Sequence, residues 1–373
     1  MGQDDSTALM DAVVMINGNL TLDRVPIPTP GPGEVLVKTL AAGICGSDLH
    51  CATHGEQLIA SAKEVAGVEL FRLDEPVVMG HEYCAELIAY GPDTARTIPL
   101  GSRVASAAPV ILRDPPVTVG FGGPDTPGAY AEFMVLTEAF LVPIPENLSD
   151  EVAVLAEPLG VALHAVNRGA LTPHHVPLVI GCGPIGLAVI AILKARGQGP
   201  IVASDFSPSR RELARALGAD VVVDPRESSP YDAWRAVAAT DDPALVGRQT
   251  PMFPETFRPC VVFECVGIPG VIQEILSNAA ACSKIVVAGL CMEPDSFQPT
   301  YGILKEIDIC FSFAPSPQEY VEALGMLASG ASQVEALITS RIGLDEVPSA
   351  FKRLADPEQD AKIIILPSAS ARA

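Results

Sequence analysis

Apolar residues along this chain fall into short runs separated by glycine, proline and polar residues, a spacing typical of alternating strands and helices. The apolar run 177–180 predicts a strand; it leads into a glycine-rich turn and then an Ala/Ile/Leu-rich helix reaching Leu193. Further strands are predicted at 200–204, 221–224, 260–265 and 285–290, with helices at 207–217 and 319–329. Strands that alternate with helices predict a parallel α/β sheet in this part of the chain.

The first part of the chain has a different pattern and is expected to be rich in β-structure. A proline-rich turn at 26–33 precedes a strand at 35–40, and the apolar run 361–366 predicts a closing strand near the end of the chain. Residues 228–259 are longer and more broken by proline than a simple crossover needs, so we expect a helix followed by a surface excursion.

One apolar stretch has the length of a membrane-spanning helix. Residues 176–193 are eighteen uncharged residues, which is the lower limit for such a helix. Because Pro177, Pro184 and three glycines interrupt the stretch, we expect strand, turn and helix instead of a membrane span.

Length and charge narrow the class of protein. A chain of 373 residues with 49% hydrophobic residues is expected to form two domains with sizeable cores. Its formal net charge of −21 argues against nucleic acid and anionic membranes as partners. Nine scattered cysteines and no signal peptide indicate a reducing, cytoplasmic location. Residues 1–6 match a minimal myristoylation pattern, but no basic cluster supplies a second anchor.

The glycine-rich turn has the pattern of a dinucleotide-binding loop. Gly181 permits a tight turn, Gly183 lets the backbone approach a pyrophosphate, and Gly186 lets the helix pack close to the strand. The alternative is a core strand-turn-helix with incidental glycines. Asp205, nineteen residues after Gly186, ends the next strand and would bind the ribose hydroxyls, which favours NAD over NADP. The nearby Arg210 and Arg211 weaken that preference.

Three clusters along the first half of the chain carry metal-binding and proton-transfer side chains. The first combines a thiol, a hydroxyl, a carboxylate and an imidazole, and by itself it could equally be a buried thiol with polar neighbours. The second pairs an imidazole with a carboxylate. The third is a carboxylate before a proline at the start of an apolar helix, where a solvated first-turn charge is the usual interpretation. In order, the residues are Cys45, Ser47, Asp48 and His50; His81 and Glu82; and Glu157.

These motifs occur in the same order as in the zinc-dependent medium-chain alcohol and polyol dehydrogenases, which the chain resembles from about Val35 to Leu366. The resemblance implies an α/β protein with a GroES-like β-rich catalytic domain and a Rossmann domain with a doubly wound parallel sheet, with the active site in the cleft between them. The expected boundaries are 1–165 for the catalytic domain, 166–314 for the Rossmann domain, and 315–373 for the return to the catalytic domain. The edge strand at 307–313 would pair across a twofold axis, giving a homodimer or homotetramer.

Residue roles follow from the resemblance by matching motifs. Cys45 and His81 match zinc ligands, and Glu82 and Glu157 match two carboxylates of which the sequence does not say which coordinates directly. Ser47 would take the proton of the substrate alcohol and His50 would pass it outward, while Asp48 would orient His81. The cofactor-binding residues implied for NAD are Gly181, Gly183, Pro184, Ile185, Gly186, Asp205, Arg210, Val266 and Leu290.

Two features depart from the family pattern. Many members hold a structural zinc with four cysteines, but residues 105–127 contain none, so one catalytic zinc and no structural zinc are expected. The thirty-six residues from Cys45 to His81 exceed the expected spacing; the extra segment, 53–73, has helix-forming composition around 57–65. This segment would either border the substrate entrance or be an unrelated surface helix.

The leading interpretation is a zinc- and NAD-dependent dehydrogenase of a small-molecule alcohol, with a secondary alcohol or polyol favoured. Two alternatives stay open at this point. One is a zinc-free reductase of carbonyl or enone substrates on the same scaffold, and the other is a non-catalytic NAD-binding protein. The intact set of zinc and proton-relay residues argues against both.

Overall fold

The computed structural model of the protein describes residues 8–369, so the pattern at 1–6 lies outside the described residues. The chain forms two compact units: unit 1 extends to Glu157 and resumes at Ile338, and unit 2 is Pro158–Leu337. The sequence boundaries at 165/166 and 314/315 differ from these breaks. The helix α9 (Pro317–Ala328) belongs to unit 2, where the Glu319 carboxylate accepts a hydrogen bond from Asn167 at 2.8 Å.

Unit 1 is built mainly on antiparallel strands, with a seven-stranded sheet of order β10-β6-β5-β3-β18-β17 in which β9 also pairs with β3 and only β17 and β18 are parallel among the pairs described. A second sheet has the order β2-β1-β4, and β7 and β8 form a separate pair. The strands are β1 (Leu9–Ile16), β2 (Asn19–Pro26), β3 (Glu34–Gly43), β4 (Val77–Val78), β5 (Glu82–Tyr90), β6 (Arg103–Ser106), β7 (Val110–Ile111), β8 (Val117–Thr118), β9 (Phe133–Thr137), β10 (Leu141–Pro143), β17 (Ile338–Ile342) and β18 (Lys362–Ile365). The predicted closing strand therefore joins the β-rich unit, by pairing antiparallel with β3.

The helices of unit 1 are few, and the first of them is longer than the helix predicted around 57–65. They are α1 (Gly46–Ala66), α2 (Asp150–Val154) and α10 (Val347–Leu354), with short 3-10 helices η1 (Glu138–Phe140), η3 (Leu344–Glu346) and η4 (Pro367–Ala369). The helix expected around 57–65 is the second half of α1, which starts directly after Cys45 and kinks at His54. Ser47, Asp48 and His50 therefore lie on the first turns of α1. The Asp48 carboxylate caps the start of this helix by accepting a hydrogen bond from the Cys45 backbone N–H.

The cysteine-free segment 105–127 is held by an arginine. The guanidinium of Arg113 donates through Nε to Glu34 Oε1 at 2.6 Å and through a second nitrogen to Glu34 Oε2 at 2.9 Å. A third nitrogen lies 3.0 Å from Asp125. Burial raises the pKa of Glu34, but Arg113 and the Gly31 N–H outweigh burial and lower it overall. The segment thus has a bidentate ion pair as its fixed point, and part of it forms the β7–β8 pair.

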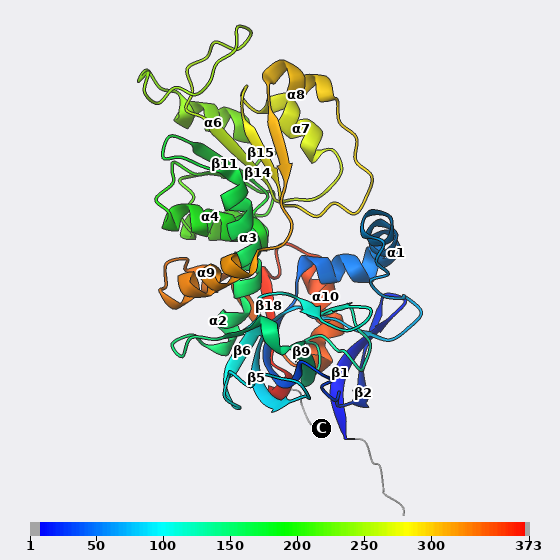
Figure 1. Cartoon of the computed structure of the whole chain (residues 1–373). Coiled ribbons are helices and arrows are strands. Elements are labelled where there is room, and N and C mark those ends of the chain that lie inside the picture. Colours follow the sequence, from blue (N-terminus) through cyan, green and yellow to red (C-terminus); the bar gives the residue numbers. More distant parts are fainter. Residues whose placement is uncertain (1–7, 370–373) are drawn as a thin grey trace, which may run out of the picture. The chain divides into compact units, whose positions relative to one another are not determined.

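Unit 2 is a six-stranded, fully parallel sheet of order β13-β12-β11-β14-β15-β16, flanked by helices (Figure 1). Its strands are β11 (Val176–Ile180), β12 (Val202–Ser204), β13 (Val221–Val223), β14 (Cys260–Glu264), β15 (Lys284–Val287) and β16 (Asp308–Phe311). Its helices are α3 (Ala156–Gly169), which starts at the unit boundary, α4 (Pro184–Ala195), α5 (Pro208–Ala216), α6 (Pro230–Ala238), α7 (Val271–Asn278), α8 (Pro299–Lys305), α9 and the 3-10 helix η2 (Val334–Leu337). This strand order reverses direction next to β11, which confirms the predicted doubly wound architecture.

Three helices of unit 2 begin at the same dipeptide. Ser207, Ser229 and Ser316 are the N-caps of α5, α6 and α9, and each is followed by proline. The serine hydroxyl accepts a free backbone N–H, and proline at the first helical position has no N–H to leave unpaired. Local sequence therefore sets where these helices start.

The stretch 176–193 is divided between β11, the glycine turn and α4, as expected. Among residues 8–369, no helix combines the length and apolar character needed to cross a membrane.

Candidate active site

The first group of predicted site residues lies in unit 1, where a thiol and an imidazole are neighbours. Cys45 precedes α1, and His81 lies between β4 and β5. Burial lowers the pKa of His81, but Asp48 and then Cys45 outweigh it and raise the pKa well above its usual value. His81 Nε2 lies 3.4 Å from Ser47 Oγ, and His81 Nδ1 lies 3.4 Å from Asp48 Oδ1. The structure thus brings together four of the predicted residues, with Asp48 on one side of the ring and Ser47 on the other.

Asp48 is held in place by a tyrosine that the sequence did not single out. Tyr130 is fully buried, and its hydroxyl donates to Asp48 Oδ2 at 2.6 Å. The Cys45 backbone N–H donates to the same oxygen at 3.0 Å. Gly80 has φ of +101°, and a Cβ there would lie 2.7 Å from the Tyr130 ring, so only glycine leaves room for the ring. Burial raises the pKa of Asp48, but His81, Tyr130 and Cys45 together lower it, so the carboxylate stays charged.

Glu82 is fully buried and forms an ion pair with a residue far away along the chain. Both of its carboxylate oxygens lie 2.7 Å from Lys362 Nζ, and the same ammonium donates to the Ile44 carbonyl at 3.1 Å. Burial lowers the pKa of Lys362, but Glu82 outweighs burial and raises it. The sequence signal for this pair is a lysine at the start of the apolar strand β18. A carboxylate held this way is fixed in position by its counter-ion.

Glu157 has a different environment from Glu82. It lies in the first turn of α3, partly buried, and no hydrogen bond or ion pair to its carboxylate is found within residues 8–369. Burial raises its pKa to about 7; Glu82 and Asp48 add to this effect, and His81 partly offsets it. A carboxyl group without a partner beside an imidazole is available to a ligand, which distinguishes Glu157 from the solvated first-turn charge considered above.

The donor set fits zinc in its chemistry. Thiolate, imidazole and carboxylate are the groups that zinc takes, and Asp48 orients the imidazole as a partner of a metal-bound histidine does. Within the described part of the chain, no three or more His, Cys, Asp or Glu side chains are arranged as a metal site. The candidate zinc ligands are thus neighbours, but their side chains do not converge on one metal position, and the Glu82 carboxylate pairs with Lys362.

His50 is not joined to this group. It is partly buried on α1, and its nearest ring partner is His54, with ring centroids 5.8 Å apart. Burial, and next His54, lower the pKa of His50, which favours the neutral imidazole. No hydrogen bond links His50 to Ser47 among residues 8–369, so the relay between them stays a prediction.

The second group of predicted residues is the glycine turn of unit 2. Gly181 has φ of +91°, where an L-residue is strained. A Cβ on Gly186 would lie 1.9 Å from the Gly181 carbonyl oxygen, so the helix can approach the strand only with glycine there. Gly183 is the N-cap of α4, and Pro184 and Ile185 form its first turn. The helix start therefore presents free backbone N–H groups, as anion-binding loops do.

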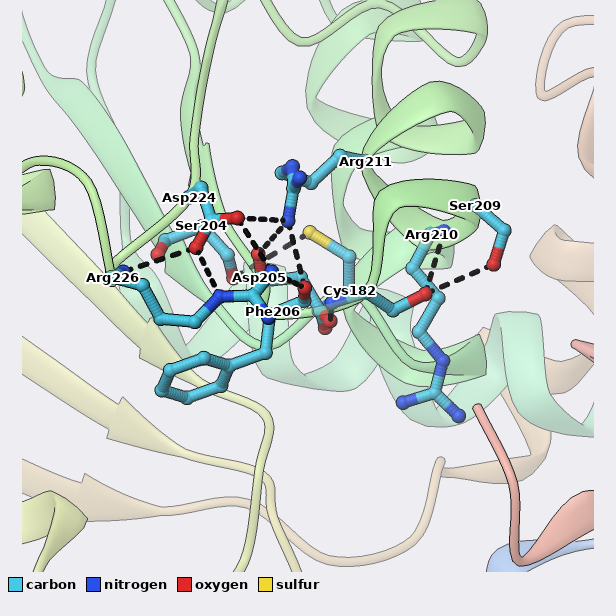
Figure 2. Close-up of polar contacts among 10 residues, drawn as sticks. Cys182, Ser204, Asp205, Phe206, Ser209, Arg210, Arg211, Asp224 and Arg226 are labelled. Atoms are coloured by element: carbon cyan, nitrogen blue, oxygen red, sulfur yellow. Dashed lines mark hydrogen bonds and ion pairs between the residues drawn. The ribbon is translucent and has the colours of Figure 1, made fainter. Parts of the chain in front are cut away.

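Figure 2 shows how Asp205 is fixed beside this turn. Its Oδ2 accepts the Cys182 backbone N–H at 2.7 Å, and its Oδ1 accepts the Ser207 N–H at 2.8 Å. Arg211 lies 3.0 Å from Asp224 Oδ2 and donates to the Asp205 carbonyl, and Arg226 pairs with Asp224 through two nitrogens. The pKa of Asp224 lies far below its usual range, mainly because Arg226 donates hydrogen bonds to its carboxylate. Two of the three nearby arginines thus share the single carboxylate of Asp224, which offsets one of their two positive charges.

Arg210 points elsewhere. In Figure 2 its side chain extends away from the Asp205–Asp224 cluster, and its guanidinium lies 4.0 Å from where a Cβ on Gly183 would be. Its Nε is buried, with no hydrogen-bond partner in the described chain. An unpartnered guanidinium at a helix start suits the phosphates of a dinucleotide, so this part of unit 2 fits such a cofactor.

The remaining predicted cofactor residues lie on two loops in contact. Val266 and Leu290 are 40% and 41% exposed, so both can meet a ligand. The loops are close, because a Cβ on Gly267 would lie 2.7 Å from the Leu290 N. Glu264, at the end of β14 and 2% exposed, accepts the N–H groups of Val266 and Gly267 at 2.7 and 2.9 Å. This buried acid was missed, although a charge closing an apolar strand was its signal.

Comparisons with known proteins agree with both units. The family model described as "Alcohol dehydrogenase GroES-like domain" matches residues 31–146, and the one described as "Zinc-binding dehydrogenase" matches residues 184–329. Sorbitol dehydrogenase of Homo sapiens is 30% identical over 92% of this chain and 92% of its own length. The structure of 2R,3R-butanediol dehydrogenase from Bacillus subtilis is 26% identical, with a TM-score of 0.77 over 96% of this chain and 99% of that one. A zinc-binding dehydrogenase from Sinorhizobium meliloti 1021, solved with NADP, is 26% identical with a TM-score of 0.76, covering 96% of this chain and all of that one.

The chain therefore belongs to the family of zinc-dependent medium-chain alcohol and polyol dehydrogenases. Members of this class are oxidoreductases that act on small-molecule alcohols with zinc and a nicotinamide dinucleotide. The predicted family, fold class and enzyme class are confirmed.

Proposed function

We propose that this protein oxidises a secondary alcohol or polyol to the carbonyl compound with NAD, using one catalytic zinc held by Cys45, His81 and a carboxylate. The observation that supports this most is the grouping of a thiol, an oriented imidazole and the unpartnered Glu157 in unit 1. Of the two carboxylates, Glu157 is the better candidate for direct coordination, since Lys362 occupies both oxygens of Glu82. Bound zinc would supply Lewis acidity, which lowers the pKa of an alcohol.

The protein's own side chains then perform the proton and positioning steps. Ser47 Oγ, beside His81, would accept the substrate hydroxyl proton, and His50 would pass it towards solvent. Asp48, held by Tyr130, keeps His81 in one orientation, and Lys362 holds the Glu82 carboxylate in place. In unit 2, Asp205 would accept the ribose hydroxyls while Arg210 meets the phosphates.

The preference for NAD rests on charge. A 2′-phosphate would face the Asp205 carboxylate, and Arg211 and Arg226 are both engaged by Asp224, whose single negative charge offsets one of their two positive charges. We further propose that no structural zinc is present, because Arg113 fixes the segment that would hold it. A homo-oligomer formed through the β16 edge is supported by Phe311 and Phe313, which are 63% and 83% exposed. A cytoplasmic location is supported by nine free cysteines.

Replacing Asp205 by alanine is expected to raise the Kd for NAD about tenfold to hundredfold. This is the change in affinity that the loss of hydrogen bonds to a charged group causes. NADP binding should weaken less, because the same change removes the repulsion of a 2′-phosphate. Isothermal titration with both dinucleotides measures the ratio, with Asp241→Ala, an exposed loop position, as the control. An unchanged NAD:NADP ratio would contradict the proposed role of Asp205.

The function itself is tested by following NADH absorbance with primary, secondary, cyclic and polyol alcohols while zinc is measured on the same sample. We expect turnover of secondary alcohols or polyols and one zinc per chain. Turnover without zinc would instead identify a zinc-free reductase, and NAD binding without turnover of any alcohol would identify a non-catalytic protein.

A further inference from the structure

A cavity of about 290 Å³ lies in unit 2, away from every residue assigned to the reaction. It is lined by Cys260, the first residue of β14, and by residues 279–282, just before β15. The glycine turn follows the carboxyl end of β11, and all strands of this sheet are parallel. The cavity therefore opens at the opposite edge of the sheet from the dinucleotide loop.

The surface excursion predicted at 228–259 forms one wall of this cavity. After α6 the chain runs without regular structure to β14, as the long loops beyond α6 in Figure 1 show. The excursion is tied back on itself, because Gly247 N–H donates to the Phe257 carbonyl at 2.8 Å and Thr240 N–H to the Thr256 carbonyl at 3.1 Å. A segment longer than the fold requires thus builds a defined wall.

The lining is positively charged in a strongly acidic chain. Four cationic side chains and one acidic side chain, Glu255, line the cavity, whereas the whole chain has a net charge of −21. The cations are Arg235, Arg248, Arg258 and Lys305.

Two of these cations have no carboxylate partner among residues 8–369. Lys305 Nζ donates to the carbonyls of Leu276, Ser277 and Ala279, at 2.6 to 3.0 Å. Arg258 donates only to backbone carbonyls, among them that of His174 at 2.9 Å. Carbonyl dipoles satisfy the N–H donors but leave the positive charges uncompensated. Burial, and next Arg235, lower the pKa of Lys305, as expected in a positive field.

The other two cations can donate to a ligand directly. Arg248 is 68% exposed and is paired through one nitrogen with Glu306, and Arg235 is paired with Asp232 at 3.0 Å and with the Asn278 carbonyl. Each guanidinium has five N–H donors, so both retain donors for an added carboxylate.

The remaining surface is aromatic. Trp234 and Phe257 meet edge to face, with ring centroids 5.7 Å apart, and Phe253 lines the same cavity. The Trp234 indole is fixed by its N–H, which donates to the Val176 carbonyl at 2.8 Å. Flat, rigid rings favour a planar apolar body, and the volume is at the lower end of small-molecule pockets, about 300–1,000 Å³.

We propose that this cavity is a second ligand site, which binds a small planar organic anion such as an aromatic monocarboxylate, independently of the dinucleotide. The carboxylate meets Arg248 and Arg235, and the ring packs on the aromatic wall formed by Trp234, Phe253 and Phe257.

Trp234 is the only tryptophan of the chain, so its fluorescence reports directly on this cavity. The full-length protein is titrated with benzoate, and with benzamide as the neutral molecule of the same shape, each with and without saturating NAD. Benzoate is expected to give a saturable change at least about tenfold stronger in affinity than benzamide, because hydrogen bonds to charged groups are the stronger ones. NAD should leave the benzoate affinity unchanged.

Two variants with opposite expected effects complete the test. Arg248→Gln should weaken benzoate binding about tenfold, and Glu255→Gln should tighten it, because it removes the single acid of the lining. Arg215→Gln, an exposed position on α5, is the matched control. The proposal is overturned if benzoate gives no saturable change, if benzamide binds equally well, if both variants bind like the control, or if NAD displaces benzoate.

Discussion

Replacing Cys45 by alanine is expected to remove zinc from the protein and to lower kcat/KM at least about a thousandfold. Zinc supplies several kcal/mol of stabilisation to the reacting oxygen, and each 1.4 kcal/mol, roughly, is a factor of ten in rate. NAD affinity should stay unchanged, because the glycine turn and Asp205 belong to unit 2 whereas Cys45 belongs to unit 1. Zinc content by mass spectrometry, NAD binding by calorimetry and turnover by absorbance are measured on one preparation.

The matched control is Cys310→Ala, which removes a partly buried thiol on β16. It should retain zinc and turnover. Full activity of Cys45→Ala would end the proposed role of the thiol. Loss of NAD binding would instead indicate damage to the fold, and the variant would then have to be judged by its unfolding curve.

Replacing Lys362 by methionine is expected to destabilise the protein by about 3–5 kcal/mol, because it leaves the buried Glu82 carboxylate without its counter-ion. Urea unfolding followed by circular dichroism measures the loss. The exposed Lys352→Met on α10 should change stability by less than about 0.5 kcal/mol.

The double variant Glu82→Met/Lys362→Met separates two explanations. If the cost comes from an unpaired charge, removing both partners should restore most of the stability, since apolar replacement of a buried pair is often neutral. If the double variant is no more stable than Lys362→Met, the cost comes from lost packing, and the ion pair contributes little.

Local patterns carried most of what the sequence revealed. The glycine turn was predictable because each glycine meets a local requirement: the positive φ of Gly181 and the close approach at Gly186 arise within a few residues. The helices that begin at Ser-Pro are set in the same way. The edge position of β16 and the excursion after α6 also followed from the alternation of apolar runs and breaks.

Long-range partners were not predictable from the same patterns. Lys362 reaches Glu82 across 280 residues, and Tyr130 reaches Asp48 across 82, so no local spacing indicates either contact. The start of α1 was also missed, because Cys45 is an unusual residue at a helix start and Asp48 supplies the cap. The break after unit 2 falls later than expected because Glu319 ties α9 to α3.

The Arg113–Glu34 pair holds segment 105–127 through side chains alone. The folding of this segment is therefore independent of metal binding, whereas a four-thiolate zinc site would make it depend on metal. A chelator removes zinc by competing for the ion with its thiolate and imidazole ligands, and it does not affect the bidentate pair between Arg113 and Glu34, which needs no metal. The metal-stripped enzyme should therefore keep this lobe folded and be open to reconstitution with other divalent ions. The lobe itself would loosen instead in acid, as Glu34 takes up a proton and loses its attraction for the guanidinium.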